Sequence, residues 1–249
     1  MRVVCISDTH NFHNDMSAIP DGDILLHAGD ISGVGKRSEI DGFLEWAQKQ
    51  AKRYTHGLAF IAGNHDRCFD PKFGEYDPED EYKEGPKRKP NWLVDILHDL
   101  KFSNTGVHYL ENNWIEVGSG EDKLKIWGSP YSPWFHGDRW AFNAHRGRDI
   151  MEVWGDISMT TDILLTHTPV SYKLDYIPDT AEYVGCEDLY KVVHLVKPIM
   201  HVCGHIHEGY GLDYNMDTTF VNASICNKFY NPINEPWVFD IKDKEVTIA

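Results

Sequence analysis

Short runs of apolar residues recur along the chain, and most of them end at a glycine, aspartate, asparagine or histidine. Apolar positions within a run follow one another without alternation, which is typical of strands that are buried on both faces. Such runs are Arg2–Ser7, Asp23–His27, Leu58–Ala62, Lys123–Trp127, Asp162–Thr166 and Pro198–Cys203. The pattern predicts further strands at Val107–Leu110, Trp114–Val117, Thr219–Ala223 and Trp237–Ile241.

Between some of these strands, apolar residues recur with the spacing of a helix. In the segment Ser38–Arg53 the apolar side chains fall on one face of a helix. They are Ile40, Phe43, Leu44, Ala47 and Ala51. Ser38 and Asp41 have the spacing of a capping box at the start of this helix. Shorter helices are predicted at Pro90–Leu100 and Glu187–Lys197.

The order of these elements predicts the fold class. Strands and helices alternate early in the chain, whereas the later part is richer in strands, so we expect an α/β (α+β) protein with more than one sheet. The charged segment Asp70–Lys89 contains several prolines and glycines, and we expect a long loop there. A length of 249 residues suits one large domain. We therefore predict a single domain over residues 1–249.

The composition restricts the expected cellular compartment and the expected binding partners. The chain has 24 lysines and arginines against 39 aspartates and glutamates, a net charge of −15. Such a surface repels polymeric nucleic acid and anionic membranes. No apolar run approaches the ~18 residues that cross a bilayer, and Met1–Asp8 contains no apolar signal segment. Five cysteines without a paired motif are typical of reduced thiols, so we expect a cytoplasmic protein.

Polar side chains at the strand ends form the candidate site. In α/β sheets ligands bind outside the carboxyl ends of the strands, so residues far apart in sequence can meet there. The candidates are Asp8, His10, Asp30, Asn64, His65, Asp66, His167, His205 and His207.

Several of these residues are spaced to hold metal ions. Asp8 and His10 lie two positions apart on an extended segment, and so do His205 and His207. Residues at this spacing point to the same side of a strand, so each pair can face one ion. Asp30 offers two oxygens and can bridge two ions. The pattern therefore predicts a site for two divalent metals.

The donor types indicate which metals and which chemistry. Asn64 would add an oxygen ligand and His167 a nitrogen ligand. Imidazoles and carboxylates without cysteine favour Mn, with Fe, Zn, Ni or Co as alternatives, over Mg or Ca. Two ions ~3.5–4 Å apart can activate a bridging hydroxide and hold phosphate oxygens. Asn64 and His65 are placed to contact the substrate, and we expect His65 to act as the general acid, with Asp66 orienting its ring.

The motifs that carry these residues resemble those of calcineurin-like metallophosphoesterases. In chain order they are Asp8-x-His10, Gly29-Asp30, Gly63-Asn64-His65-Asp66, Thr166-His167 and Gly204-His205-x-His207. Other stretches are similar to the metallophosphoesterase-domain-containing (MPPED-type) family. These are Trp127–Phe135, Val184–Cys186, His205–Gly211 and Phe220–Cys226. With them, the similarity runs nearly from end to end.

The resemblance implies two facing mixed sheets flanked by helices, with two metal ions at the sheet ends. It implies that one metal is held by Asp8, His10, Asp30 and His207. It implies that the second is held by Asp30, Asn64, His167 and His205. Some MPPED-type relatives carry glycine where this chain has His205, which weakens their second metal site. The complete set in this chain implies an active dinuclear site.

The aromatic loop 133–140 contains further candidates. We expect Trp134 and His136 to contact the substrate. The rings of Trp134, Phe135 and Trp140 can stack on a nucleobase, but packing of the loop onto the core is the favoured alternative for these rings.

The expected activity is hydrolysis of small phosphodiesters, with cyclic nucleotides as the favoured substrates. Few lysines or arginines lie near the motifs, which favours a diester over the more highly charged monoester. Two alternatives remain open: a phosphomonoesterase or protein phosphatase on the same core, and a non-catalytic nucleotide-binding scaffold. Ligand histidines must be neutral to hold metal, so we expect metal occupancy to fall below about pH 5–6.

Overall fold

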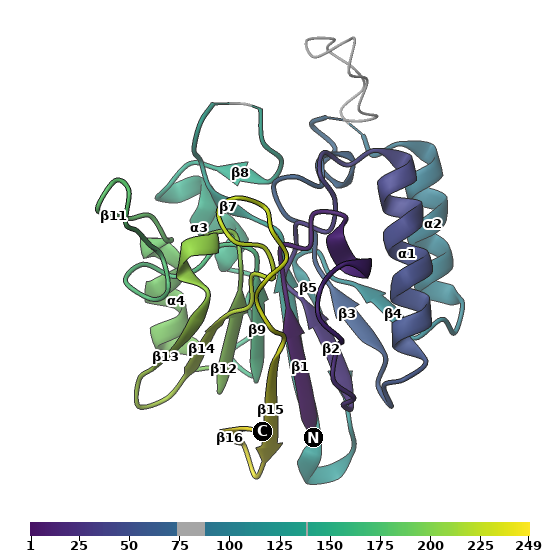
Figure 1. Ribbon diagram of the computed structural model, residues 1–249. Coiled ribbons are helices and arrows are strands. Elements are labelled where there is room, and N and C mark those ends of the chain that lie inside the picture. The colour runs from purple at the N-terminus through teal and green to yellow at the C-terminus, as the bar shows by residue number, and fades with distance from the viewer. Residues whose placement is uncertain (74–87, 138) are drawn as a thin grey trace.

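Two six-stranded sheets face each other at the centre of the protein, and helices cover their outer faces (Figure 1). The computed structural model describes residues 1–73, 88–137 and 139–249. Most of the predicted loop Asp70–Lys89 lies outside these ranges. Among the described helices, none has the length and hydropathy needed to cross a membrane.

The first sheet has a parallel centre and an antiparallel edge. Its strand order is β16-β15-β1-β2-β3-β4. The strands are β1 (Arg2–Ile6), β2 (Ile24–His27), β3 (Leu58–Phe60), β4 (Val107–Tyr109), β15 (Trp237–Lys242) and β16 (Glu245–Ile248). Strands β1 to β4 are parallel, whereas β15 is antiparallel to β1. The carboxyl ends of β1, β2 and β3 therefore meet at one edge.

The second sheet also has a parallel centre, but both of its edge strands are antiparallel. Its order is β13-β14-β12-β9-β6-β5. The strands are β5 (Asn113–Val117), β6 (Leu124–Ser129), β9 (Ile163–Thr166), β12 (Met200–Cys203), β13 (Gly211–Tyr214) and β14 (Thr219–Asn222). The four central strands are parallel, and β5 and β13 are antiparallel edges.

Helices lie on both outer faces. The first sheet packs against α1 (Arg37–Ala51) and α2 (Asn91–Phe102), and the second against α3 (Arg148–Trp154) and α4 (Glu187–Val196). The predicted capping box of α1 is wrong. The helix begins at Arg37, and the Glu39 carboxylate accepts hydrogen bonds from the backbone N–H groups of Lys36 and Val34 at 2.8 and 3.2 Å.

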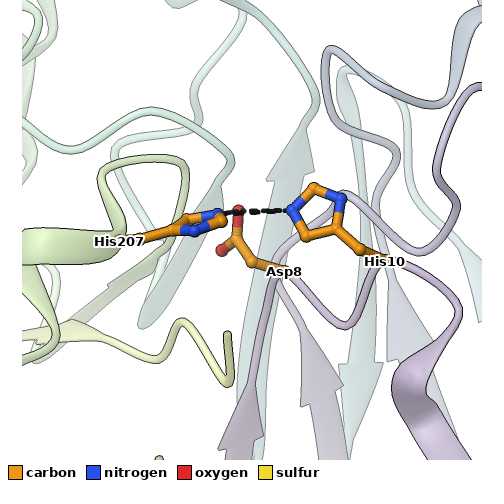
Figure 2. A group of neighbouring side chains, drawn as sticks. All are labelled: Asp8, His10 and His207. Carbon is orange, nitrogen blue, oxygen red and sulfur yellow. Dashed lines mark hydrogen bonds and ion pairs between the residues drawn. The ribbon is translucent and has the colours of Figure 1, made fainter. Parts of the chain in front are cut away.

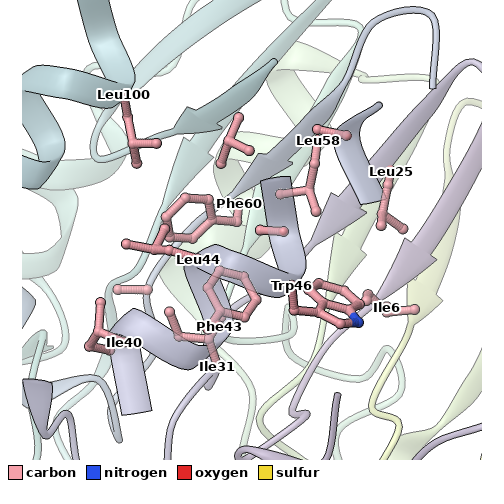
Figure 3. Packing of buried hydrophobic residues seen from close by; sticks show 14 of the residues in the cluster. Ile6, Leu25, Ile31, Ile40, Phe43, Leu44, Trp46, Leu58, Phe60 and Leu100 are labelled. Atoms are coloured by element: carbon pink, nitrogen blue, oxygen red, sulfur yellow. The ribbon is translucent and has the colours of Figure 1, made fainter. Parts of the chain in front are cut away.

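Alternate side chains of the central strands enter different hydrophobic layers. In β1, Val3 and Cys5 pack between the two sheets, whereas Val4 and Ile6 face α1. Figure 3 shows the layer under α1, where Phe43 of the helix packs against Phe60 of β3 with ring centroids 5.2 Å apart. Because both faces of these central strands are covered, they carry continuous apolar runs, as predicted.

The sequence pattern does not predict several short elements. These are α3, β13, β16, β7 (Ser132–Pro133), β8 (Asn143–Ala144), β10 (Tyr176–Ile177), β11 (Glu182–Tyr183) and the single 3₁₀ turns at Phe12–Asn14, Arg67–Phe69, Gly120–Asp122 and His207–Gly209. They lack the apolar runs that indicate the equally short strands β3 and β4.

Candidate metal centre

The candidate residues lie in loops that follow the carboxyl ends of parallel strands from both sheets. Strands β1, β2 and β3 lead into the loops that carry Asp8, His10, Asp30, Asn64 and His65. Strands β9 and β12 lead into those that carry His167, His205 and His207. The structure brings both groups together at one end of the sandwich.

The backbone at four of these residues is in the left-handed region. The φ angles are 51° at Asp8, 41° at His10, 53° at Asp30 and 66° at His205. This conformation is uncommon for residues other than glycine and clusters at functional sites. Gly204 shows how closely the loops approach, because a Cβ atom there would overlap the Asp8 carboxylate.

One cluster consists of Asp8, His10 and His207 (Figure 2). His207 Nε2 lies 3.3 Å from Asp8 Oδ1 and 3.3 Å from His10 Nε2. The Nδ1 atoms point away and donate to backbone carbonyls, at 3.3 Å to Ser32 for His10 and at 2.9 Å to Asn227 for His207. Both rings therefore present Nε2 to the space beside Asp8, as metal-ligating imidazoles do.

A second cluster consists of Asp30, His167 and His205. His205 and His207 thus belong to different clusters, and the prediction that this pair faces one ion is wrong. His167 Nε2 lies 3.4 Å from Asp30 Oδ2 and 2.9 Å from Asn64 Oδ1, and its Nδ1 lies 2.9 Å from the Ala28 carbonyl oxygen. The rings of His167 and His205 are 4.9 Å apart. Burial lowers the pKa of His205 to about 3, so its imidazole is neutral and able to bind a metal.

Asp30 lies between the two clusters. Its Oδ2 atom is 3.8 Å from His10 Nε2 of the first cluster and 3.4 Å from His167 Nε2 of the second. Its Oδ1 atom accepts a hydrogen bond of 2.9 Å from the backbone N–H of His65. One carboxylate oxygen thus faces both groups, which is the position of a bridging ligand.

The two carboxylates of the clusters favour positive charge beside them, which either a proton on an imidazole or a bound metal ion can supply. Burial lowers the pKa of His10 to about 4. Burial also acts to lower the pKa values of His167 and His207, but the adjacent Asp30 and Asp8 carboxylates raise them to about 9. Although burial disfavours their charge, these carboxyls have pKa values below the usual range because the imidazoles face them. Two ionised carboxylates among imidazoles fit divalent metals that prefer mixed nitrogen and oxygen donors.

His65 lies beside both clusters. Its Nδ1 atom is 2.7 Å from the Gly33 carbonyl oxygen, which leaves Nε2 available to a ligand. Its ring lies 4.6 Å from that of His10 and 4.5 Å from that of Trp140. A His65 nitrogen is also within 4.8 Å of donor atoms of His10 and Asp30. These contacts fix the ring next to the two donor clusters.

The structure corrects the expected partner of His65. Asp66 is fully buried and makes its hydrogen bonds elsewhere. Its carboxylate accepts from the backbone N–H groups of Ile31, Ser32 and Gly63 at 3.1, 2.9 and 2.8 Å, and from the Ser32 hydroxyl at 2.5 Å. Asp66 therefore joins the loops after β2 and β3, and Gly33 is the residue that orients the His65 ring.

The clusters open into a cavity of about 660 Å³. Trp134 and His136, the predicted substrate-binding residues, line it together with Phe135 and Trp140. Trp134 is 42% exposed. The rings of Phe135 and Trp140 are stacked with centroids 6.2 Å apart, and Phe135 lies 5.0 Å from His205. The aromatic loop thus forms one wall of the cavity.

Tyr230 also lines the cavity and lies outside the motifs recognised in the sequence. Its ring lies 4.8 Å from that of His10 and 5.3 Å from that of His207, and its backbone is left-handed with φ 59°. Tyr230 follows the predicted strand Thr219–Ala223. Ligands bind outside the carboxyl ends of the strands, and applying this to the strand Thr219–Ala223 would have indicated the loop that carries Tyr230.

Facing mixed sheets with these donor clusters at their carboxyl ends define the architecture of a metallophosphoesterase. Residues 1–209 match the family model of the calcineurin-like phosphoesterases. The chain belongs to this family, which confirms the resemblance seen in its motifs. Metallophosphoesterase domain-containing protein 1 of human and of mouse is 39% identical over 244 residues, which cover 96% of this chain and 71% of the relative.

A solved structure supports the fold. Phosphopantetheinyl Hydrolase (PptH) from Mycobacterium tuberculosis aligns with a TM-score of 0.54 and 16% identity, over 89% of this chain and 88% of that chain. At this identity the likeness concerns the fold alone.

Proposed function

We propose that the protein is a dinuclear metal-dependent phosphodiesterase that hydrolyses small phosphodiesters, with cyclic nucleotides as the first candidates. The observation that carries the proposal is the position of Asp30, whose Oδ2 atom lies 3.8 Å from His10 and 3.4 Å from His167 beside an open cavity. Two bound divalent ions, with Mn²⁺ preferred, would supply Lewis-acid activation of water and neutralise phosphate charge.

His65 provides the acid in this proposal. The hydrogen bond to Gly33 holds a proton on Nδ1, so a second proton on Nε2 can be given to the leaving oxygen of the ester. The rings of His10 and Trp140 restrict rotation of the imidazole. A fixed donor beside the metal-binding residues reduces the loss of entropy in the proton-transfer step.

The charge of the cavity supports a diester over a monoester. Arg146 and Lys228 are the only lysine or arginine residues among the described residues that line it. Arg146 donates to two backbone carbonyls at 2.9 Å each, and Lys228 pairs with Asp179 at 2.7 Å. Glu182 and Glu208 line the same cavity. The charge of Lys228 is thus paired, two Arg146 N–H groups are engaged with backbone carbonyls, and two acidic side chains line the same cavity. This balance suits a diester, which carries one negative charge less than a monoester dianion.

The size and walls of the cavity support a small aromatic substrate. A volume of about 660 Å³ lies within the roughly 300–1,000 Å³ of sites that hold drug-sized ligands. The exposed Trp134 ring offers a surface on which a nucleobase can stack. The chain's net charge of −15 disfavours a long nucleic acid.

The test is a comparison of substrates with Mn²⁺ added to the purified protein. We expect turnover of bis(p-nitrophenyl) phosphate and of 2′,3′- or 3′,5′-cyclic nucleotides, with kcat/KM well above that for p-nitrophenyl phosphate. A faster monoester reaction would favour the phosphomonoesterase or protein phosphatase alternative. Binding of nucleotides without turnover with any of Mn, Fe, Zn, Ni or Co would favour the scaffold alternative.

A further inference from the structure

The end of β14 and the residues that follow it make buried polar contacts behind the donor clusters. Asn222, Ala223 and Ser224 match a glycosylation sequon, but Asn222 and Ser224 are fully buried, so the folded chain presents no acceptor there. Both side chains are committed to hydrogen bonds within the protein.

Ser224 contacts the Asp8 carboxylate directly. Its hydroxyl lies 2.9 Å from Asp8 Oδ2 and 2.8 Å from Asn222 Oδ1. The hydroxyl has one proton, and donation to the charged carboxylate gives the stronger bond. The backbone N–H of His205 also donates to the Asp8 carboxylate at 3.0 Å. These donors fix Asp8 from one side while its Oδ1 atom faces His207 (Figure 2).

Asn222 holds the loop that carries two of the imidazoles. Its amide nitrogen donates to the Ile206 carbonyl oxygen at 2.8 Å, and Ile206 lies between His205 and His207. Its carbonyl oxygen accepts from the backbone N–H of Ser224 at 3.1 Å. Asn222 thereby connects the loop after β12 to the residue that contacts Asp8.

The same segment joins the two sheets at the candidate metal centre. Ala223 donates to the Cys203 carbonyl of the second sheet at 2.9 Å. Ile225 then donates to the Ser7 carbonyl at 2.8 Å, directly before Asp8 of the first sheet. The position of Asp8 relative to His207 therefore depends on this connection.

We propose that Ser224 and Asn222 are positioning residues for the metal centre, with Ser224 acting on Asp8 and Asn222 on the loop that carries His205 and His207. This inference rests on the metal binding proposed above. Side chains that orient metal ligands in this way typically change metal affinity by about 10–100-fold when removed. We expect that loss for Mn²⁺ in the variant Ser224→Ala, and a similar loss for Asn222→Ala.

A matched control lies at the other end of the same strand. The Thr218 hydroxyl is buried and donates to the Pro198 carbonyl at 2.7 Å. The variant Thr218→Val removes a buried hydrogen bond of the same kind without touching the donor clusters. The variant Ser224→Thr keeps the hydroxyl and should restore part of the Mn²⁺ affinity.

The experiment is calorimetric titration of each metal-free protein with Mn²⁺, with the thermal midpoint of each metal-free variant measured in parallel. Weakened binding in Ser224→Ala with normal binding in Thr218→Val supports the inference. Wild-type affinity in Ser224→Ala, or equal weakening in both variants, overturns it. A wild-type protein that takes up no Mn²⁺ and no other divalent metal would overturn the proposed function itself.

Discussion

The Nδ1 atom of His65 lies 2.7 Å from the backbone carbonyl oxygen of Gly33. A carbonyl oxygen can only accept, so Nδ1 carries a proton and Nε2 is the nitrogen that exchanges a proton with a ligand. Gly33 belongs to the loop after β2 and His65 to the loop after β3. The orientation of the candidate acid therefore depends on how these two loops are held together.

Replacing His65 should slow hydrolysis according to the leaving group. In His65→Gln we expect kcat to fall by about 10²–10⁴-fold for a cyclic nucleotide, whose alkoxide needs a proton. The loss should be far smaller for bis(p-nitrophenyl) phosphate, because p-nitrophenolate leaves without protonation. The measurement is kcat for both substrates at saturating Mn²⁺. The control is His194→Gln on the exposed face of α4, and equal losses on both substrates would argue against an acid role.

Replacing Asp66 should destabilise the protein. Its carboxylate accepts four hydrogen bonds from Ile31, Ser32 and Gly63. In Asp66→Asn the amide NH₂ group would face one or more of these donors. Since a buried donor left without a partner costs about 1–3 kcal/mol, we expect the free energy of unfolding to fall by about that amount or more.

Urea denaturation in the presence of EDTA measures this effect without a contribution from metal. Asp41→Asn provides the control, because Asp41 lies on the surface of α1, 3.5 Å from Arg37. If Asp66→Asn matched the stability of the wild type and changed only the reaction rate, a role for Asp66 in orienting His65 would replace the structural one.

The positions of the candidate metal-binding residues could be predicted from sequence because they depend on the chain's regular elements. Asp8, Asp30 and His167 each follow a buried strand, and parallel strands place their carboxyl ends at one edge. The partner of His65 could not be predicted in this way. Gly33 contributes only a backbone oxygen, and a backbone atom leaves no trace in the pattern of side chains.

The contact of Ser224 with Asp8 and the helix α3 could not be predicted from the sequence for a related reason. The contact of Ser224 with Asp8 joins residues 216 positions apart, and it depends on the crossing of one segment between two sheets. The helix α3 spans only Arg148–Trp154, which is two turns and too short to establish an apolar stripe. Tertiary contacts rather than local periodicity determine both features.

Lowering the pH should destabilise the metal-free protein through His201. This residue is almost fully buried, and burial lowers its pKa from 6.5 to about 3. Its Nε2 atom lies 2.7 Å from the Thr166 hydroxyl, which itself donates to the Thr168 carbonyl. Nε2 is therefore the protonated nitrogen of the neutral ring, and buried Nδ1 has no partner within the described part of the chain.

Acidification lowers the free energy of unfolding because the unfolded chain takes up a proton on His201 at a higher pH than the folded protein does. Below about pH 6.5 the unfolded chain protonates His201, whereas the folded protein does so only near pH 3. The stabilisation is complete above pH 6.5 and falls on acidification by up to about 1.4 kcal/mol per pH unit. His201→Gln, which can keep a donor toward Thr166, should reduce the slope of unfolding free energy against pH by that amount. His98→Gln, with 66% of the His98 side chain exposed, should leave the slope unchanged, and an unchanged slope in His201→Gln would contradict the assignment.

The number of bound metals should respond differently to changes at Asp30 and His205. His205 belongs to one donor cluster with Asp30 and His167, whereas Asp30 also lies within reach of His10. We expect the wild type to bind about two Mn²⁺ per chain, and His205→Ala to keep the ion beside Asp8. Asp30→Asn should weaken the binding of both ions, because an amide offers one neutral oxygen in place of a carboxylate that faces both clusters.

Elemental analysis after dialysis against Mn²⁺ measures the stoichiometry of each variant, and near-UV circular dichroism shows that each is folded. If Asp30→Asn lost no more metal than His205→Ala, Asp30 would serve one ion only, and the two clusters would act as separate sites instead of one bridged centre.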